Sequence, residues 1–227
     1  LYFLHIVFVE QATFIRQRTC KSMGKITDIV RQKGNKSRVS LFLDGAFLCG
    51  LDELTAVKNR LEIGTEIDGE DIARIQAESE YVTALDKSLS RLSVRPRSER
   101  EIRDFLKDKG YLSAVSDKVC ARLSELGYLD DAAYARQYID ENKCRYGAVR
   151  LKNELIKRGV DRDIIDEQLD GCDRDEAVVA LARSLWRSCG KDKYKLKNKL
   201  YAKGCNGEDI SFAIDALESE GAFDEEE

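Results

Sequence analysis

Leu155–Gly159, with the sequence Leu-Ile-Lys-Arg-Gly, reads as the end of an amphipathic helix that stops at a glycine after a basic residue. Two other segments end in the same way, Phe105–Gly110 (Phe-Leu-Lys-Asp-Lys-Gly) and Leu200–Gly204 (Leu-Tyr-Ala-Lys-Gly). Glycine can adopt the left-handed conformation that closes a helix, and a basic residue before it complements the negative end of the helix dipole. The three glycines lie 49 and 45 positions apart, a spacing typical of helical repeat proteins. The pattern therefore predicts three related helical units.

Each of these helices is expected to have two companions. An amphipathic pattern precedes it over residues 82–92, 131–144 and 174–188, and a third helix is expected after each glycine. Asp161 and Asn206 can cap the third helix in the second and third units. Chance similarity between amphipathic helices is the alternative interpretation. We predict three-helix modules of about 45 residues.

The composition supports the helical interpretation, because only one of the 227 residues is proline. Proline lacks the backbone N–H and clashes with the preceding turn, so it is excluded from helix interiors. Pro96 is expected at the break between the first and second helices of the first module. Gly147 and Gly190 lie near the corresponding break in the other two modules.

A small antiparallel sheet of about three strands is predicted before the helical modules. The strands are expected over residues 26–30, 39–43 and 46–49. Asp44-Gly45 is a strong hairpin-turn signal between the second and third strands. Asp52 can cap a short helix whose apolar residues Leu54, Val57 and Leu61 share one face.

The predicted fold class is mainly α, with three tandem three-helix modules forming an elongated curved array and a small N-terminal antiparallel β element. A loop at residues 62–68 is expected to lead into a long helix. Met23 is the only methionine and directly precedes the β pattern, so we expect it to be the working start and the residues before it to be non-native or disordered. The predicted division is a leader at 1–22, the sheet with its short helix at 23–69, the first module with a long lead-in helix at 70–127, the second module at 128–171, the third module at 172–221 and an acidic tail at 222–227.

Several classes of function are unsupported by the sequence. The seven cysteines contain no Cys-x-x-Cys pair, so neither a metal site nor a disulfide framework is expected, and a reducing cytoplasm is the default. The only histidine, His5, leaves nothing for a Ser-His-Asp triad, and no glycine-rich phosphate loop is present. Leu1–Val9 is apolar but far shorter than the roughly 20 residues that span a membrane. We predict a binding protein without catalytic residues, metal, other cofactor or membrane partner.

The formal net charge of −4 conceals a segregation of charge along the chain. Residues 143–158 contain six basic side chains against Glu154 alone, and residues 187–203 contain seven against Asp192 alone. The helices after the glycines are acidic, which argues against a DNA-reading helix-turn-helix because phosphates would repel its second helix. The basic helices suit a polyanion or an acidic protein groove. The alternative is a solvated basic face that pairs with the acidic third helices.

Binding is expected on basic residues of the second and third modules. Arg150, Asn153 and Lys157 are spaced by three and four, so they share one helix face. Tyr134 and Tyr138 could stack on bases as in single-strand binders, although a place in the helix core is favoured. The candidate site residues are Arg136, Lys143, Arg145, Arg150, Lys152, Lys157, Lys195, Lys197 and Lys199.

A set of short motifs lies between Gly127 and Val160. The stretches are Gly127–Asp131 (Gly-Tyr-Leu-Asp-Asp), Tyr134–Arg136 (Tyr-Ala-Arg), Tyr138-Ile139, Arg145–Gly147 (Arg-Tyr-Gly), Arg150, Glu154-Leu155 and Lys157–Val160 (Lys-Arg-Gly-Val). They resemble the RecX family. The resemblance covers roughly residues 82–219 as three tandem modules, of which the first and third are more divergent. Residues 25–67 are similar to the N-terminal extension of longer family members.

The resemblance implies a cytoplasmic bacterial regulator of the recombinase RecA. It implies binding in the groove of the RecA filament on single-stranded DNA, with restraint of filament growth, ATP hydrolysis, strand exchange and the coprotease action that triggers the SOS response. The implied partner is the RecA filament, with single-stranded DNA as a second partner, and a monomer is expected. Two alternatives remain open: a helical-repeat protein whose primary contact is single-stranded DNA, and a scaffold whose charges are only solvated.

Overall fold

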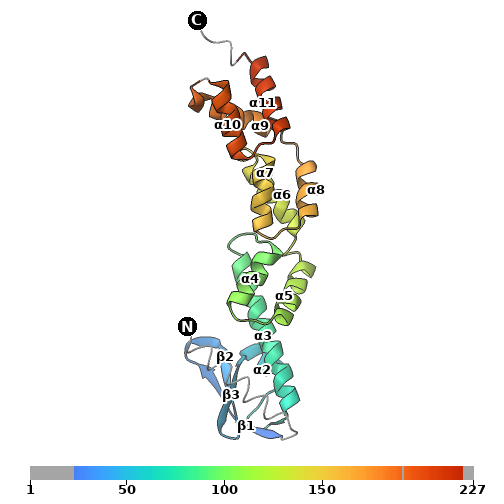
Figure 1. Ribbon diagram of the computed structural model, residues 1–227. Helices are drawn as coiled ribbons and strands as arrows, with labels where there is room; N and C mark the ends of the chain where they lie inside the picture. The colour runs from blue at the N-terminus through green and yellow to red at the C-terminus, as the bar shows by residue number, and fades with distance from the viewer. Residues whose placement is uncertain (1–22, 191, 222–227) are drawn as a thin grey trace. The chain divides into compact units, whose positions relative to one another are not determined.

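The computed structural model describes residues 23–190 and 192–221, so the leader predicted at 1–22 and the tail predicted at 222–227 lie outside the described residues. The strands are β1 (Gly24–Gln32), β2 (Asn35–Leu43), β3 (Ala46–Asp52) and β4 (Glu66–Ile67). The helices are α2 (Glu53–Lys58), α3 (Gly69–Leu92), α4 (Glu99–Asp108), α5 (Ser113–Glu125), α6 (Asp131–Asn142), α7 (Ala148–Lys157), α8 (Arg162–Asp170), α9 (Asp175–Trp186), the 3-10 helix η1 (Arg187–Cys189), α10 (Lys193–Lys203) and α11 (Gly207–Ser219) (Figure 1). None of the helices in these ranges is long and apolar enough to cross a membrane.

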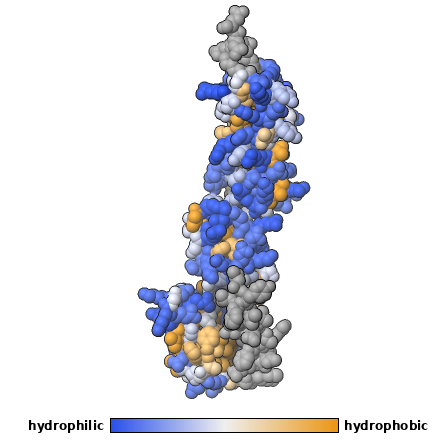
Figure 2. Space-filling model, turned by 60° about the vertical axis from the view of Figure 1, so that its left-hand side comes forward, coloured by the Kyte–Doolittle hydropathy of each residue, from blue (hydrophilic) through white to orange (hydrophobic). Residues whose placement is uncertain are grey.

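The described chain separates into two compact units. The first contains the sheet, α2, α3 as far as Arg91, and Leu106–Val119; the second contains Leu92–Phe105 and the chain from Cys120 onward. On the face drawn in Figure 2, hydrophobic residues gather over the sheet-bearing part, whereas hydrophilic residues cover most of the helical part. The predicted fold class, mainly α with tandem three-helix modules and a small N-terminal antiparallel sheet, is confirmed.

The sheet has four antiparallel strands in the order β3-β2-β1-β4, one more than predicted. Asp44 and Gly45 form the predicted tight turn between β2 and β3, with φ angles of 48° and 79°. Glu66–Ile67 forms the extra strand by pairing with Gly24 and Lys25, inside the segment predicted to be a loop. A strand of two residues is too short to show an alternation of apolar and polar side chains, so the sequence does not reveal it.

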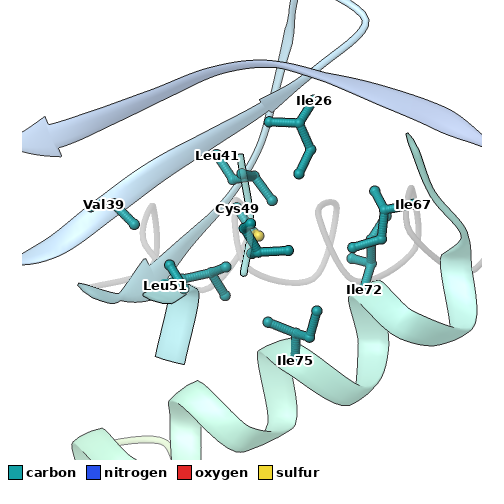
Figure 3. Packing of buried hydrophobic residues seen from close by; sticks show 10 residues of the cluster. Ile26, Val39, Leu41, Cys49, Leu51, Ile67, Ile72 and Ile75 are labelled. Carbon is teal, nitrogen blue, oxygen red and sulfur yellow. The ribbon is translucent and has the colours of Figure 1, made fainter. Parts of the chain in front are cut away.

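One face of the sheet packs against α3. Ile26, Leu41 and Leu51 point from the strands toward Ile72 and Ile75 on the helix, and all five side chains are at most 7% exposed (Figure 3). Full burial of an aliphatic side chain of this size stabilises a fold by roughly 1.5–3 kcal/mol. This small core therefore holds the sheet and the start of α3 together.

The short helix α2 begins as predicted but packs differently. The Asp52 carboxylate caps its first turn and accepts a hydrogen bond from the N–H of Leu54 at 3.0 Å. The prediction that Leu54, Val57 and Leu61 share one face of this helix is wrong for Leu61, which lies outside the helix and is buried, whereas Leu54 and Val57 are 73% and 69% exposed. The helix is six residues long and ends before Leu61, so the helical period does not extend to that residue.

Three helices, α4, α7 and α10, end at the glycines of the predicted repeat. Gly110, Gly159 and Gly204 have φ angles of +85°, +82° and +86°. In each case the N–H of the next residue donates to the carbonyl five positions earlier, at 3.1 Å (Tyr111 to Leu106), 3.2 Å (Val160 to Leu155) and 3.1 Å (Cys205 to Leu200). The left-handed helix ends are therefore confirmed.

The third helices of the last two modules begin at the predicted caps. At the start of α8, the Asp161 carboxylate accepts a hydrogen bond from the N–H of Asp163 at 2.9 Å. At the start of α11, the Asn206 side chain accepts one from the N–H of Asp209 at 2.7 Å. Both caps satisfy backbone donors that the helix itself leaves without a partner.

The second module has an apolar core of its own. Tyr134 and Ile139 on α6, Leu151 and Leu155 on α7, and Ile165 on α8 are at most 8% exposed. Because the ring of Tyr134 is buried among these side chains, the core position favoured for it from the sequence is confirmed. This core fixes the spacing of α6, which carries Arg136, and α7, which carries Arg150, Lys152 and Lys157.

Candidate functional site

The second and third modules meet where α7 begins and α10 ends. The N–H of Gly147 donates to the carbonyl of Lys203 at 3.0 Å. The N–H of Val149 donates to the carbonyl of Gly204, also at 3.0 Å. A Cβ atom at position 147 would lie 2.2 Å from the backbone nitrogen of Cys205, so glycine permits this approach. Free N–H groups at the start of one helix thereby satisfy free carbonyls at the end of the other.

Tyr146, immediately before this junction, is surrounded by cations. The guanidinium of Arg150 lies 4.2 Å from the centroid of the ring, and that of Arg145 lies 5.9 Å away. The Nζ of Lys203 lies 5.7 Å from the same centroid. Cations within about 6 Å of an aromatic ring are attracted by the negative face of its π system. We refer to these four residues as the Tyr146 cluster.

The described chain does not neutralise the positive charge of the Tyr146 cluster. None of its three cations forms an ion pair with a carboxylate within residues 23–190 and 192–221. Arg145 and Arg150 are also exposed. Like charges held around one ring repel one another, and an anion placed among them relieves that repulsion. The cluster is therefore suited to a carboxylate or a phosphate, which guanidinium groups bind by charge-assisted hydrogen bonds.

An open hollow extends from the Tyr146 cluster along α7. Its lining residues are Val149, Arg150, Asn153, Glu154, Lys157, Ala202 and Gly204. Arg150, Asn153 and Lys157 therefore lie on one face, as their spacing predicts. Glu154 reduces the positive charge at the far end, where Lys157 and Arg158 contact its carboxylate at 3.0 and 3.2 Å. Hydrogen bonds from these two cations hold the pKa of Glu154 below its usual value.

Lys152, on the same helix, is paired within the module. Its Nζ lies 2.5 and 2.6 Å from the two carboxylate oxygens of Asp166 on α8. Lys152 therefore pairs with an acidic third helix, as the alternative interpretation of the basic face expects. Its charge is offset before any partner arrives, so it contributes less to the surface potential than Arg150.

Arg136 and Lys143 line a different hollow, formed by residues of α6, of α8 and of the segments that follow these helices. The Nε of Arg136 donates to the side-chain oxygen of Gln168 at 3.0 Å. The Nζ of Lys143 donates to Asp140 at 2.9 Å, and this hydrogen bond raises the pKa of Lys143 above its usual value. Glu167 also lines the hollow, so this surface carries both signs of charge.

The three candidate lysines of the third module differ in what they contact. Lys195 pairs with Asp192, with 3.4 Å between Nζ and the carboxylate. The Nζ of Lys199 donates to the backbone carbonyl of Ser188 at 2.9 Å. Lys197 is exposed and has neither a hydrogen bond nor an ion pair within the described residues. Lys197 is thus the candidate on α10 whose charge is least engaged.

The first junction between modules has the same construction but carries acidic residues. The Oγ of Ser98 donates to the carbonyl of Arg158 at 2.5 Å, in the position that Gly147 occupies at the second junction. Arg95, close to this serine, pairs with Glu101 at 2.6 Å. The positive charge near the first junction is therefore offset, whereas the charge of the Tyr146 cluster is not.

Of the predicted site residues, the structure brings together Arg145, Arg150 and Lys157. It adds Tyr146 and Lys203, which sequence reasoning does not assign to the site. In the sequence, Lys203 is explained by its place at the negative end of a helix dipole. Its contact with Tyr146 becomes visible only in the structure, where α7 and α10 touch. The available signal is local: Arg145-Tyr146-Gly147 precedes one middle helix, and Lys203-Gly204 ends the next.

Comparison with known proteins identifies the family of the chain. Three family models match the chain: the regulatory protein RecX N-terminal domain at residues 24–68, the first RecX three-helix domain at 84–123 and the second at 130–169. "Regulatory protein RecX" of Clostridium tetani (strain Massachusetts / E88) is 32% identical over 205 residues, which are 86% of this chain and 95% of that protein. The chain belongs to the RecX family.

Other RecX proteins support the same assignment. "Regulatory protein RecX" of Bacillus subtilis (strain 168) is 33% identical over 215 residues, which cover 90% of this chain and 81% of the relative. A crystal structure of regulatory protein RecX superposes with a TM-score of 0.65 at 26% identity, covering 85% of this chain and 99% of that one. RecX from Lactobacillus salivarius, at 23% identity and a TM-score of 0.57 over 62% of this chain, shares the fold. The third module lies beyond the three matched RecX ranges.

Proposed function

We propose that this RecX-family protein regulates the recombinase RecA by binding the filament that RecA forms on single-stranded DNA. The Tyr146 cluster carries the proposal, since it gathers three cations around one ring without a carboxylate partner in the described chain. An acidic groove on a protein filament complements such a surface. The protein acts as a monomer in the cytoplasm, through binding and without chemistry of its own.

The residue types of the cluster suit a strong contact. Tyrosine and arginine are enriched among the residues that dominate the energy of protein interfaces. The ring of Tyr146 lies against Arg150 before any partner binds, so the guanidinium has less side-chain freedom to lose on association. Truncation of such a residue costs more than about 1 kcal/mol of binding free energy.

Binding in the filament groove restrains RecA. A ligand that prefers one state of a filament shifts the population toward that state and opposes the steps that leave it. In this way the bound protein opposes filament growth, ATP hydrolysis and strand exchange. Restraint of these steps also limits the coprotease action that starts the SOS response to DNA damage.

The direct test is the rate of ATP hydrolysis by RecA on single-stranded DNA, measured while this protein is added. We expect the rate to fall at protein concentrations below micromolar. An unchanged rate at micromolar protein would contradict the proposal.

The same assay distinguishes the alternative in which single-stranded DNA is the primary partner. If the protein acts only by sequestering DNA, a large excess of single-stranded DNA at constant RecA restores the rate. If it acts on the filament, the fall in rate persists once all RecA is bound to DNA. The second outcome is the one we expect.

A further inference from the structure

Helix α10 carries two tyrosines that the protein leaves in solvent. Tyr194 and Tyr201 are 74% and 75% exposed, in contrast to the buried ring of Tyr134. Neither ring has an aromatic or cationic contact within the described residues. They are seven residues apart, so they lie on one face, two turns or about 10.5 Å apart along the helix axis. Lys197 lies on the same face between them.

The helix that holds these rings has an excess of positive charge. Lys193–Lys203 contains five lysines and no acidic residue, and of these lysines Lys193 pairs with Glu218 on α11 and Lys195 pairs with Asp192. The carboxylate at its start, Asp192, is already engaged, because it accepts hydrogen bonds from the N–H groups of Tyr194 and Lys195 at 2.9 and 3.0 Å. The backbone hydrogen bond from Lys195 holds the pKa of Asp192 below its usual value. No unengaged carboxylate on this helix opposes an approaching phosphate.

Exposed aromatic rings interleaved with lysines match the chemistry of unpaired nucleic-acid strands. Bases stack on aromatic faces whatever their identity, while the lysines follow the phosphates. The separation of about 10.5 Å between the rings exceeds the 3.4 Å rise per nucleotide of a stacked strand. The two rings therefore cannot take neighbouring bases of a duplex, whose faces are in any case covered by stacking. They can take two bases of an unstacked strand.

We propose that Tyr194, Lys197 and Tyr201 form a base-stacking surface for single-stranded DNA on α10. This surface is distinct from the Tyr146 cluster and goes beyond the proposed function, because it requires no RecA. It supplies a direct DNA contact through the third module.

The proposal is tested by binding of the full chain to fluorescently labelled oligothymidylate, followed by anisotropy. An oligomer of the same length and charge without bases should bind at least tenfold more weakly, since it offers phosphates but nothing to stack. Tyr194→Ala and Tyr201→Ala should each weaken binding to oligothymidylate by about fivefold or more. The phenylalanine variants at both positions should bind as the unchanged protein does, because their rings still stack.

Two controls separate stacking from charge and from misfolding. Tyr128→Ala removes a tyrosine that is 57% exposed in the connection before α6, and it should leave DNA binding unchanged. Lys197→Ala should reduce the slope of log affinity against log salt by about 0.7, whereas the tyrosine variants should not change that slope. Equal affinity for the oligomer without bases, full competition by duplex DNA, or unchanged binding of the alanine variants would each overturn the proposal. The RecA ATPase assay is a separate measurement that needs RecA, so a failure of DNA binding here does not decide the proposed RecA regulation.

Discussion

A methyl group at position 147 would collide with backbone atoms instead of a side chain that could rotate away. It would lie 2.2 Å from the nitrogen of Cys205 and 2.4 Å from the carbonyl carbon of Gly204. The φ angle of Gly147 is −76°, which any residue adopts, so the demand for glycine here is one of space alone. The approach of two modules thus depends on the absence of one side chain.

Gly147→Ala should therefore lower the free energy of unfolding by about 1–3 kcal/mol, the usual cost of overpacking. The measurement is urea unfolding followed by far-ultraviolet circular dichroism. Gly207→Ala is the matched control, because a Cβ at this first residue of α11 would meet open space. It should leave stability unchanged or raise it slightly, since alanine favours helix. Equal stability of the two variants would contradict the close junction.

Some side-chain contacts are predictable from the sequence and others are not. The caps Asp161 and Asn206 are predictable because their hydrogen bonds go to backbone groups only two or three positions away. The partner of Lys152 is not, since Asp166 lies 14 residues along the chain and reaches it only after α8 folds back against α7. Hydrogen bonds between near neighbours in the chain can be predicted from the sequence, whereas ion pairs between exposed residues on different helices cannot.

The two junctions between modules have the same arrangement of helices but use different hydrogen-bond donors. At the first junction the hydroxyl of Ser98 reaches the carbonyl of Arg158, and at the second the backbone N–H of Gly147 reaches the carbonyl of Lys203. In both, the start of a middle helix satisfies the end of the next middle helix. The glycine-ended helices are predictable from sequence, but their contact with the preceding module is not, because no local pattern encodes it.

Ser98→Ala should lower the free energy of unfolding by about 1–2 kcal/mol. The variant leaves the Arg158 carbonyl without this donor, and it also removes the hydroxyl that accepts from the N–H of Glu101 at 3.2 Å. Ser124→Ala, at an exposed position of α5, should change stability by less than about 0.5 kcal/mol. A loss of stability in Ser98→Ala no larger than in this control would show that the junction hydrogen bond contributes nothing.

In the whole molecule, a formal net charge of −4 coexists with a local excess of positive charge. The sequence predicts which segments are basic, and it includes Arg145 and Arg150 among the candidates. It does not predict that Lys203 joins them around Tyr146, because the cluster exists only once α7 and α10 touch. The distinction between engaged and unengaged cations on one helix is a property of the folded chain.

We propose that unengaged charge in the Tyr146 cluster, and not basic charge in general, binds the RecA filament. Arg150→Ala and Lys152→Ala remove one positive charge each from α7, but Lys152 is already paired with Asp166. The decisive measurement compares the concentrations at which these variants halve ATP hydrolysis by RecA on single-stranded DNA. We predict that Arg150→Ala needs at least about fivefold more protein than the unchanged chain, the effect of losing more than about 1 kcal/mol of binding free energy, while Lys152→Ala stays within twofold. Equal potency of Arg150→Ala and the unchanged chain, or an equal loss in both variants, would contradict the claim.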